Sequence, residues 1–152
     1  MLLYTVEERE KLNLLNTNKN CYKVDNLFYL YNEDALKLLK LLPDNSIDLF
    51  FTDPPYFLSN DGITCSGGKM VSVNKGGWDK EDTLSVDEFN YQFLKEAKRI
   101  IKPSGSIWVS GTLHNIYSVG YQMKKLGLRI LNNIIWQKTN PPPNLSCRYF
   151  TH

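Results

Sequence analysis

Residues 47–56, with the sequence IDLFFTDPPY, constrain the fold most, because a largely apolar run ends abruptly in four stiff residues. A run of this kind is typical of a strand that is covered on both faces. Each proline fixes its own φ and restrains the residue before it, so Asp53 leaves the strand end with little conformational freedom. We therefore expect a rigid carboxylate at the end of a buried strand.

The segments around this run alternate between strand and helix signals. Strands are expected at residues 28–32 (FYLYN), 106–111 (SIWVSG) and 128–139 (LRILNNIIWQKT), helices at 35–43, 85–102 and 114–127, and a turn at 44–46. Glu33 and Asp34 cap the first helix, and Ser85 and Glu88 begin the second in capping-box spacing. This alternation predicts an open parallel α/β sheet, in which ligands bind beyond the carboxyl ends of the strands.

Two segments fall outside the alternation. Residues 1–27 are polar, with one expected helix at 6–15, and we predict a peripheral lead-in to a domain that occupies residues 28–152. Within that domain, residues 57–83 hold five of the nine glycines and show almost no periodicity. A loop of this length is either functional or disordered. We predict a mobile insertion that orders on substrate, and a merely decorative insertion is the alternative.

The composition of the 152 residues, 42% hydrophobic and 22% charged, fits one soluble globular domain or part of one. Cys21, Cys65 and Cys147 are far apart and lack CxxC spacing, so neither a disulfide framework nor a zinc site is supported, and no metal is expected. No apolar run approaches the roughly 20 residues that a membrane span requires. We therefore expect a cytoplasmic protein without a membrane partner.

The net charge of +2 conceals an uneven distribution. Residues 1–66 carry six Lys and Arg against ten Asp and Glu, whereas residues 67–152 carry twelve against six, and no acidic residue follows Glu96. A basic segment with interleaved Trp and Tyr suits a polyanion such as nucleic acid, although a simply solvated basic face is the alternative. By charge and position, the candidate DNA contacts are Lys138, Asn144 and Arg148.

The DPPY segment offers two fixed hydrogen-bond acceptors beside an aromatic ring. The Asp53 carboxylate is one acceptor, and the carbonyl of Pro54, which has no N–H, is the other. Two such acceptors match an exocyclic NH2 group, which has two protons to donate, and Tyr56 can stack on the ring that bears this group. The implied ligand is an amino-bearing heteroaromatic base. The alternative is an Asp-Pro-Pro turn next to a core tyrosine.

The amino group of adenine is a poor nucleophile, because its lone pair is delocalised into the ring. Two hydrogen bonds to its protons favour a pyramidal nitrogen and stabilise the positive charge that develops on attack, which is electrostatic preorganisation. A base that belongs to DNA must leave the duplex to reach such a site, and stacking on an aromatic ring offsets part of the unstacking cost.

These residues resemble the amino-group DNA methyltransferases that use S-adenosylmethionine. DPPY is similar to their catalytic motif, and residues 32–56 match most of GDxLxxLxxLPDxSVDLIxTDPPY, the pattern of the family's β-type arrangement. Residues 93–111 and 132–152 are similar to later family segments, and the insertion at 57–83 is similar to that of the GATC-type adenine enzymes. The resemblance covers about residues 28–152. It implies an open, mostly parallel, Rossmann-like methyltransferase sheet with flanking helices, incomplete in this chain.

Carried over residue by residue, the resemblance implies catalytic roles for the whole DPPY motif. Asp53 and Pro54 would hold the target amino group, Pro55 would complete the rigid segment, and Tyr56 would stack on the flipped base. Aspartate at the head of the motif favours adenine N6 over cytosine N4 as the target.

The resemblance also implies a cofactor site, of which residues 1–152 would hold one part and the glycine-rich loop another. Asp34 and Ala35 would lie near the adenine of S-adenosylmethionine, with Asp53 as a third cofactor residue. Family members usually have glycine where Glu33 stands. In the β-type order, the glycine-rich FxGxGT cofactor loop would lie beyond His152.

We therefore expect the N-terminal half of a site-specific DNA adenine N6-methyltransferase of a restriction–modification system. It would bind DNA, be inactive alone, and have a C-terminal half or a homo-oligomer as its partner. Three alternatives stay open. They are a truncated protein that binds DNA or complements a separate half, a cytosine N4-methyltransferase, and an enzyme that methylates another planar amide or amine, for which NPPY is more typical.

Overall fold

The computed structural model describes residues 6–24, 28–57, 63–66, 69–72, 84–113, 115–137 and 139. The chain divides into two compact units, Met1–Phe51 with Gln92–Trp108 and Thr52–Tyr91 with Val109–His152. The helices are α1 (Val6–Asn16), α2 (Ala35–Leu41), α3 (Val86–Ile100) and α4 (Ile116–Lys125). The strands are β1 (Cys21–Val24), β2 (Phe28–Tyr31), β3 (Ile47–Thr52), β4 (Ile63–Ser66), β5 (Lys69–Ser72) and β6 (Ile101–Val109).

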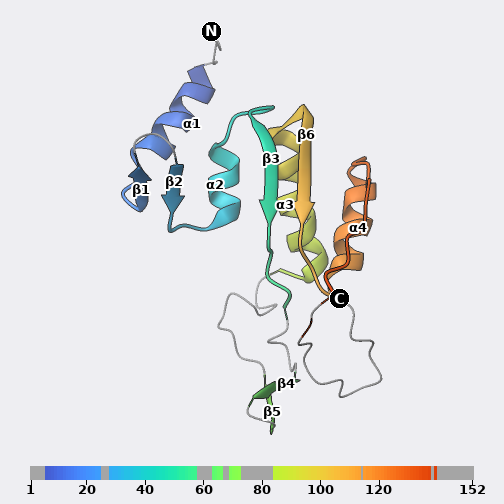
Figure 1. Ribbon diagram of the computed structural model, residues 1–152. Helices are drawn as coiled ribbons and strands as arrows, with labels where there is room; N and C mark the ends of the chain where they lie inside the picture. Colours follow the sequence, from blue (N-terminus) through green and yellow to red (C-terminus); the bar gives the residue numbers. More distant parts are fainter. Residues whose placement is uncertain are drawn as a thin grey trace. The chain divides into compact units, whose positions relative to one another are not determined.

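The described strands form three pairs. β3 and β6 lie side by side and run in the same direction, which makes a small parallel sheet (Figure 1). β1 pairs with β2 and β4 pairs with β5, both antiparallel. The described part of the chain is therefore a mixed α/β structure, and the predicted parallel pairing of the two central strands is confirmed.

Helix α3 supplies most of the buried apolar side chains among the described residues. It begins as predicted, because the Ser85 hydroxyl accepts a hydrogen bond from the N–H of Glu88 at 3.2 Å. Burial of a large apolar side chain contributes about 1.5–3 kcal/mol. The second half of α3, which runs along the parallel sheet (Figure 1), therefore forms the core of the first unit. The buried side chains of this half are Phe93, Leu94, Ala97 and Ile100.

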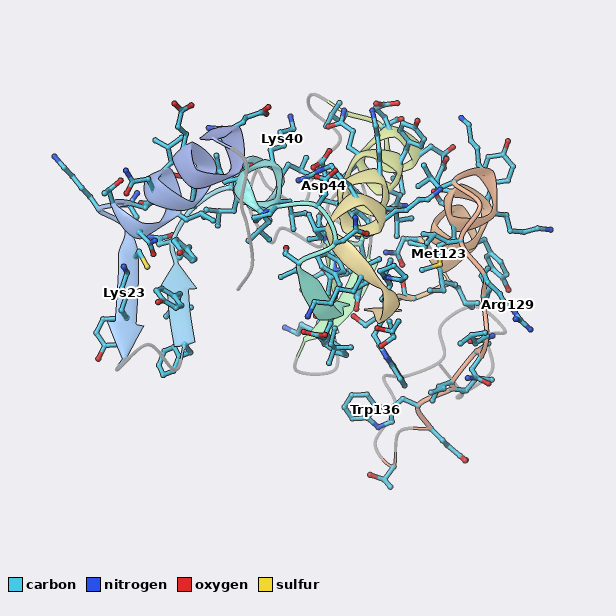
Figure 2. The ribbon with its side chains drawn as sticks, turned by 90° about the horizontal axis from the view of Figure 1, so that it is seen from above. Lys23, Lys40, Asp44, Met123, Arg129 and Trp136 are labelled. Carbon is cyan, nitrogen blue, oxygen red and sulfur yellow. The ribbon has the colours of Figure 1, made fainter. Side chains whose placement is uncertain are left out.

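Arg99 ties the end of α2 to α3. Its guanidinium donates to the carbonyls of Leu39 and Leu42, each at 2.8 Å. It also pairs with Glu96 and with Asp44, which lies just after α2 (Figure 2). The last carbonyls of a helix have no partner within the helix, so Arg99 satisfies groups that α2 leaves open. Partial burial lowers the pKa of this guanidinium, but the bonds to Asp44 and Glu96 outweigh it and raise the pKa above its ordinary value.

In the second unit, α4 packs on the start of α3 through polar side chains. The fully buried Asn90 donates from Nδ2 to the Ser118 hydroxyl at 2.9 Å, and that hydroxyl donates to Asp87 at 2.5 Å. The helix closes on Gly127 as predicted, with a φ of 73° that glycine adopts without steric cost. The hydrogen bonds of Ser118 fix α4 against the start of α3.

The apolar run at residues 47–52 forms β3, but the prediction that both faces are covered is wrong. Leu49 and Phe51 are 57% and 69% exposed, because no described element covers the face of β3 on which they lie. The expected helix end at residue 102 is also wrong, since α3 ends at Ile100 and β6 begins at Ile101. A proline lacks an N–H, and Pro103 is tolerated in β6 because this strand has only one described neighbour.

Two other expected strands differ from the structure. Residues 28–31 form β2, but this strand pairs with β1 inside the expected lead-in and does not join the parallel sheet. Residues 128–136 form no strand and are largely exposed, and Gln137 makes an isolated β-bridge. Trp136, 75% exposed, lies on this segment at a distance from Met123 of α4 (Figure 2).

The insertion at residues 57–83 contains a hairpin that the sequence did not predict, in which β4 and β5 pair with Ile63 opposite Ser72. The predicted mobility falls mainly on residues 58–62, 67–68 and 73–83, which lie outside the described residues. Within the described ranges, no helix has the length and apolar character needed to cross a membrane.

Replacing Arg99 with alanine should lower the free energy of unfolding by about 2–3 kcal/mol, because two helix-end carbonyls and two carboxylates lose their partner. Urea denaturation followed by circular dichroism measures the change. Lys95→Ala, on the exposed face of the same helix, is the matched control and should change the value by no more than about 0.5 kcal/mol. Equal effects of the two substitutions would refute the role given to Arg99.

Candidate active site

The carboxyl ends of β3 and β6 bring Asp53 and Ser110 together. Thr52 ends β3, and its carbonyl accepts a hydrogen bond from the Ser110 N–H at 2.9 Å, one residue beyond the end of β6. Asp53 and Ser110 are thus the first residues past two parallel strands, at the edge of the sheet where α/β proteins bind ligands. The Ser110 hydroxyl donates to Oδ1 of Asp53 at 2.5 Å.

Tyr56 joins the same cluster. Its hydroxyl donates to the same Oδ1 of Asp53 and lies 3.4 Å from the Ser110 hydroxyl. Asp53 is exposed, whereas Pro54 is buried and Tyr56 is half-buried. The carboxylate is therefore held at the surface by two hydroxyls and is not turned into the core. Two donors on one oxygen restrict rotation of the carboxylate, in addition to the restraint that the prolines place on the backbone.

Phe57 turns the chain directly after the motif. Its φ of 54° lies in the left-handed region. A phenylalanine rarely adopts this conformation, because it costs about 1–3 kcal/mol. Its ring packs edge-on against Phe89 of α3, with ring centroids 5.5 Å apart and planes at 73°. An aromatic pair of this kind contributes about 0.5–1.5 kcal/mol and so offsets part of that cost. Phe57 thereby anchors the DPPY segment to the first turn of α3.

The loop after Ser110 is closely packed. A Cβ at Gly111 would lie 2.9 Å from Oδ1 of Asn115 and 2.9 Å from Cδ1 of Ile116, so a larger residue would displace them. The same oxygen of Asn115 accepts a hydrogen bond from the N–H of Thr112 at 2.9 Å, and Asn115 is fully buried. These contacts define the path of the backbone on the far side of Ser110.

The surroundings of Tyr56 keep its phenol protonated. Partial burial raises the pKa of Tyr56 above 10.0, and the hydrogen bond to Asp53 and the charge of that carboxylate raise it further. The hydrogen bond with Ser110 acts in the opposite direction and lowers the pKa. At neutral pH, Tyr56 therefore remains a donor to Asp53.

The residues predicted to contact the methyl donor, Asp34, Ala35 and Asp53, are all among the described residues. Asp34 caps α2 as predicted, since its Oδ1 accepts a hydrogen bond from the N–H of Lys37 at 2.9 Å, and Ala35 begins the helix. These residues belong to the first unit and Asp53 to the second, so a cofactor site shared by the three stays a prediction. The glycines in the described ranges are isolated from one another, so none of these ranges supplies a glycine-rich cofactor loop.

Some predicted site residues are not placed, and two contributors were missed. Lys138, Asn144 and Arg148 lie outside the described residues, so their DNA contacts stay predictions. Searched over the described residues alone, the chain holds no group of three His, Cys, Asp or Glu suited to a metal. Ser110 lies near the end of the strand expected at residues 106–111, but no strand order was predicted that would place it beside Asp53. Phe57 carries no sequence signal for its left-handed backbone.

Removing the Asp53 carboxylate should lower the pKa of Tyr56 toward 10.0, because the phenolate loses a repelling charge and the phenol loses its acceptor. Since the folded-state pKa is the raised one, the stability that this bond gives is complete below pH 10.0 and declines as the pH rises through the folded-state value. NMR titration of 13Cζ-labelled tyrosine in the wild type and Asp53→Ala measures the change, with Tyr56→Phe for assignment. An unchanged Tyr56 pKa would show that the bond is not formed in solution.

A family model and three individual relatives all match this chain to methyltransferases. The family described as DNA methylase matches residues 47–152. The type II methyltransferase M2.DpnII of Streptococcus pneumoniae is 54% identical over 132 residues, which are 86% of this chain and 49% of that protein. M2.LlaDCHI of Lactococcus lactis subsp. cremoris is 53% identical over 135 residues, 88% of this chain and 50% of that protein.

A third relative matches a shorter stretch. M.HinfI of Haemophilus influenzae, also a type II methyltransferase, is 48% identical over 113 residues, 73% of this chain and 32% of that protein. The chain thus spans about half the length of the first two relatives and about a third of this one. Because the family match begins at β3 and includes the motif, α3, β6 and α4, the chain belongs to the DNA methylase family.

Proposed function

We propose that this chain is the catalytic-motif part of a site-specific DNA adenine N6-methyltransferase of a restriction–modification system. The observation that carries the proposal is the exposed Asp53 carboxylate at a parallel strand end, held by the hydroxyls of Tyr56 and Ser110. The family match supports methyl transfer to DNA, and the relatives named type II methyltransferases support the restriction–modification setting.

The residues of the motif act by fixing the target amino group. The Asp53 carboxylate and the Pro54 carbonyl accept its two N–H protons, which favours a pyramidal nitrogen and stabilises the positive charge that builds on it. Pro55 keeps the segment stiff, so that Tyr56 stacks on the base once the base has left the duplex. The bond from the Tyr56 hydroxyl keeps its ring beside the carboxylate. When bound, S-adenosylmethionine supplies the methyl group.

The small parallel sheet is, in this proposal, part of an open Rossmann-like sheet that polypeptide outside residues 1–152 completes. The exposure of Leu49 and Phe51 and the greater length of the relatives support this. A C-terminal half would supply the glycine-rich loop and complete the donor site with Asp34, Ala35 and Asp53. A homo-oligomer is the second candidate partner.

The remaining parts of the chain have supporting roles in the proposal. Residues 1–27 are a peripheral lead-in, and residues 28–152 form the catalytic-motif part, in which the insertion at 57–83 orders on DNA. The basic second half of the chain meets the phosphate backbone, in the cytoplasm where the DNA lies. The DNA contacts include Lys138, Asn144 and Arg148.

A labelled-methyl assay tests the function. Residues 1–152 alone should transfer almost no methyl groups from S-adenosylmethionine to a duplex that contains GATC, the sequence of the enzymes that the chain resembles. The fusion enzyme, defined here as residues 1–152 joined to the second half of the S. pneumoniae relative, should methylate this duplex, with the label on adenine N6. Robust transfer by residues 1–152 alone would refute the half-enzyme proposal, label on cytosine N4 would refute the target, and an inactive fusion enzyme would refute the function.

Substitution of Asp53 tests the catalytic role. In the fusion enzyme, Asp53→Ala should reduce methyl transfer by at least about 10²-fold, as expected for loss of electrostatic stabilisation, with the binding of S-adenosylmethionine largely intact. Asp48→Ala is the matched control, because this exposed carboxylate on β3 makes a surface ion pair with Lys102, which is worth about 0–1 kcal/mol. Unfolding of Asp53→Ala would instead favour a structural role.

A further inference from the structure

We infer that Ser110 is a positioning residue, whose hydroxyl orients the Asp53 carboxylate for recognition of the target amino group. The inference rests on the proposed function, since it assigns a partner to the carboxylate that the proposal places against the substrate. Ser110 directly follows β6 and Asp53 directly follows β3, so the contact joins residues 57 apart in the sequence.

The hydroxyl of Ser110 is separate from the part of the residue that maintains the sheet. The backbone N–H of Ser110 already donates to the Thr52 carbonyl at 2.9 Å, which continues the strand pairing. The hydroxyl lies 3.4 Å from that same carbonyl but only 2.5 Å from Oδ1 of Asp53. Its main contact is therefore with the exposed carboxylate, and a change confined to the hydroxyl leaves the sheet bond in place.

Two hydroxyls on one oxygen define the orientation of the carboxylate. The terminal torsion of an aspartate is broad, so the carboxylate rotates easily unless its surroundings prevent it. Ser110 and Tyr56 both donate to Oδ1, from positions 3.4 Å apart. We assign Oδ1 to these hydroxyls and Oδ2 to an N–H of the substrate. Without the Ser110 hydroxyl, Oδ1 loses one of these two donors, and the carboxylate regains part of the rotation that moves Oδ2 out of line with the amino group.

The first test needs no substrate. Without the Ser110 hydroxyl, Oδ1 of Asp53 loses a donor and accepts the hydrogen bond from Tyr56 more strongly, so Ser110→Ala should raise the pKa of Tyr56 further in the 152-residue chain. NMR titration of 13Cζ-labelled tyrosine follows it, with Tyr56→Phe for assignment. Ser106→Ala, an exposed serine on the same strand, is the matched control and should leave the Tyr56 pKa unchanged. An unchanged Tyr56 pKa in Ser110→Ala would overturn the inferred contact.

The second test isolates recognition of the amino group. The fusion enzyme is titrated with two duplexes that carry either adenine or purine, which lacks the amino group, at the target position. The cost of flipping each base out of its duplex is the same for every protein variant. A change between variants in the ratio of the two Kd values therefore reports the contact with the amino group. Ser110→Ala should lower the preference for adenine about fivefold, the size of one net hydrogen bond. Ser110→Thr, which keeps the hydroxyl, and the control Ser106→Ala should both retain the wild-type preference for adenine.

The outcomes separate the inference from the proposed function. A wild-type fusion enzyme without preference for adenine would overturn the proposed function, and the inference with it. A wild-type preference that Ser110→Ala retains would overturn the inference alone. An equal loss of affinity for both duplexes in Ser110→Ala would show a structural role for Ser110, which also overturns the inference.

Discussion

The parallel pairing of β3 and β6 is the constraint on which the site depends. Parallel strands end at the same edge of a sheet. Once β3 and β6 are paired, the residue after β3 therefore lies beside the residue after β6. The bond from the Ser110 N–H to the Thr52 carbonyl extends the pairing to the point where the chemistry begins. A shift in this register would separate the two residues, whatever their identity.

Stiff elements around this edge convert a flexible side chain into a fixed acceptor. The prolines restrict the backbone at Asp53, and two hydroxyls restrict the carboxylate. Phe57 adds a strained turn that its contact with Phe89 helps to offset. Each effect is worth about 1 kcal/mol or a few, which is enough to favour one orientation of a single carboxylate.

Sequence reasoning predicted the parts of the fold that local chemistry decides. The caps at Asp34 and Ser85 and the helix end at Gly127 are confirmed, because each depends on one residue and its neighbours in the chain. Burial was harder to predict. An apolar run indicates that a strand prefers to be covered, but it does not indicate whether the described residues contain the covering element, and for Leu49 and Phe51 they do not.

In the site, too, the features set by neighbouring residues were predicted, and those set by the pairing of distant strands were not. The DPPY motif identified Asp53 and the acceptor chemistry, because the prolines that restrain Asp53 follow it directly in the sequence. Ser110 is 57 positions away and meets Asp53 only through strand order, so a local pattern could not reveal it. The expected strand at residues 128–139 failed for a related reason, since strand propensity alone provides no neighbour for pairing.

The most direct test of the account is a crystal structure of the fusion enzyme with a GATC duplex and a non-reactive analogue of S-adenosylmethionine. The account predicts a flipped adenine stacked on Tyr56, with its N6 nitrogen about 2.7–3.2 Å from both an Asp53 carboxylate oxygen and the Pro54 carbonyl oxygen. A flipped adenine whose N6 nitrogen lies beyond hydrogen-bonding distance of both oxygens would contradict it.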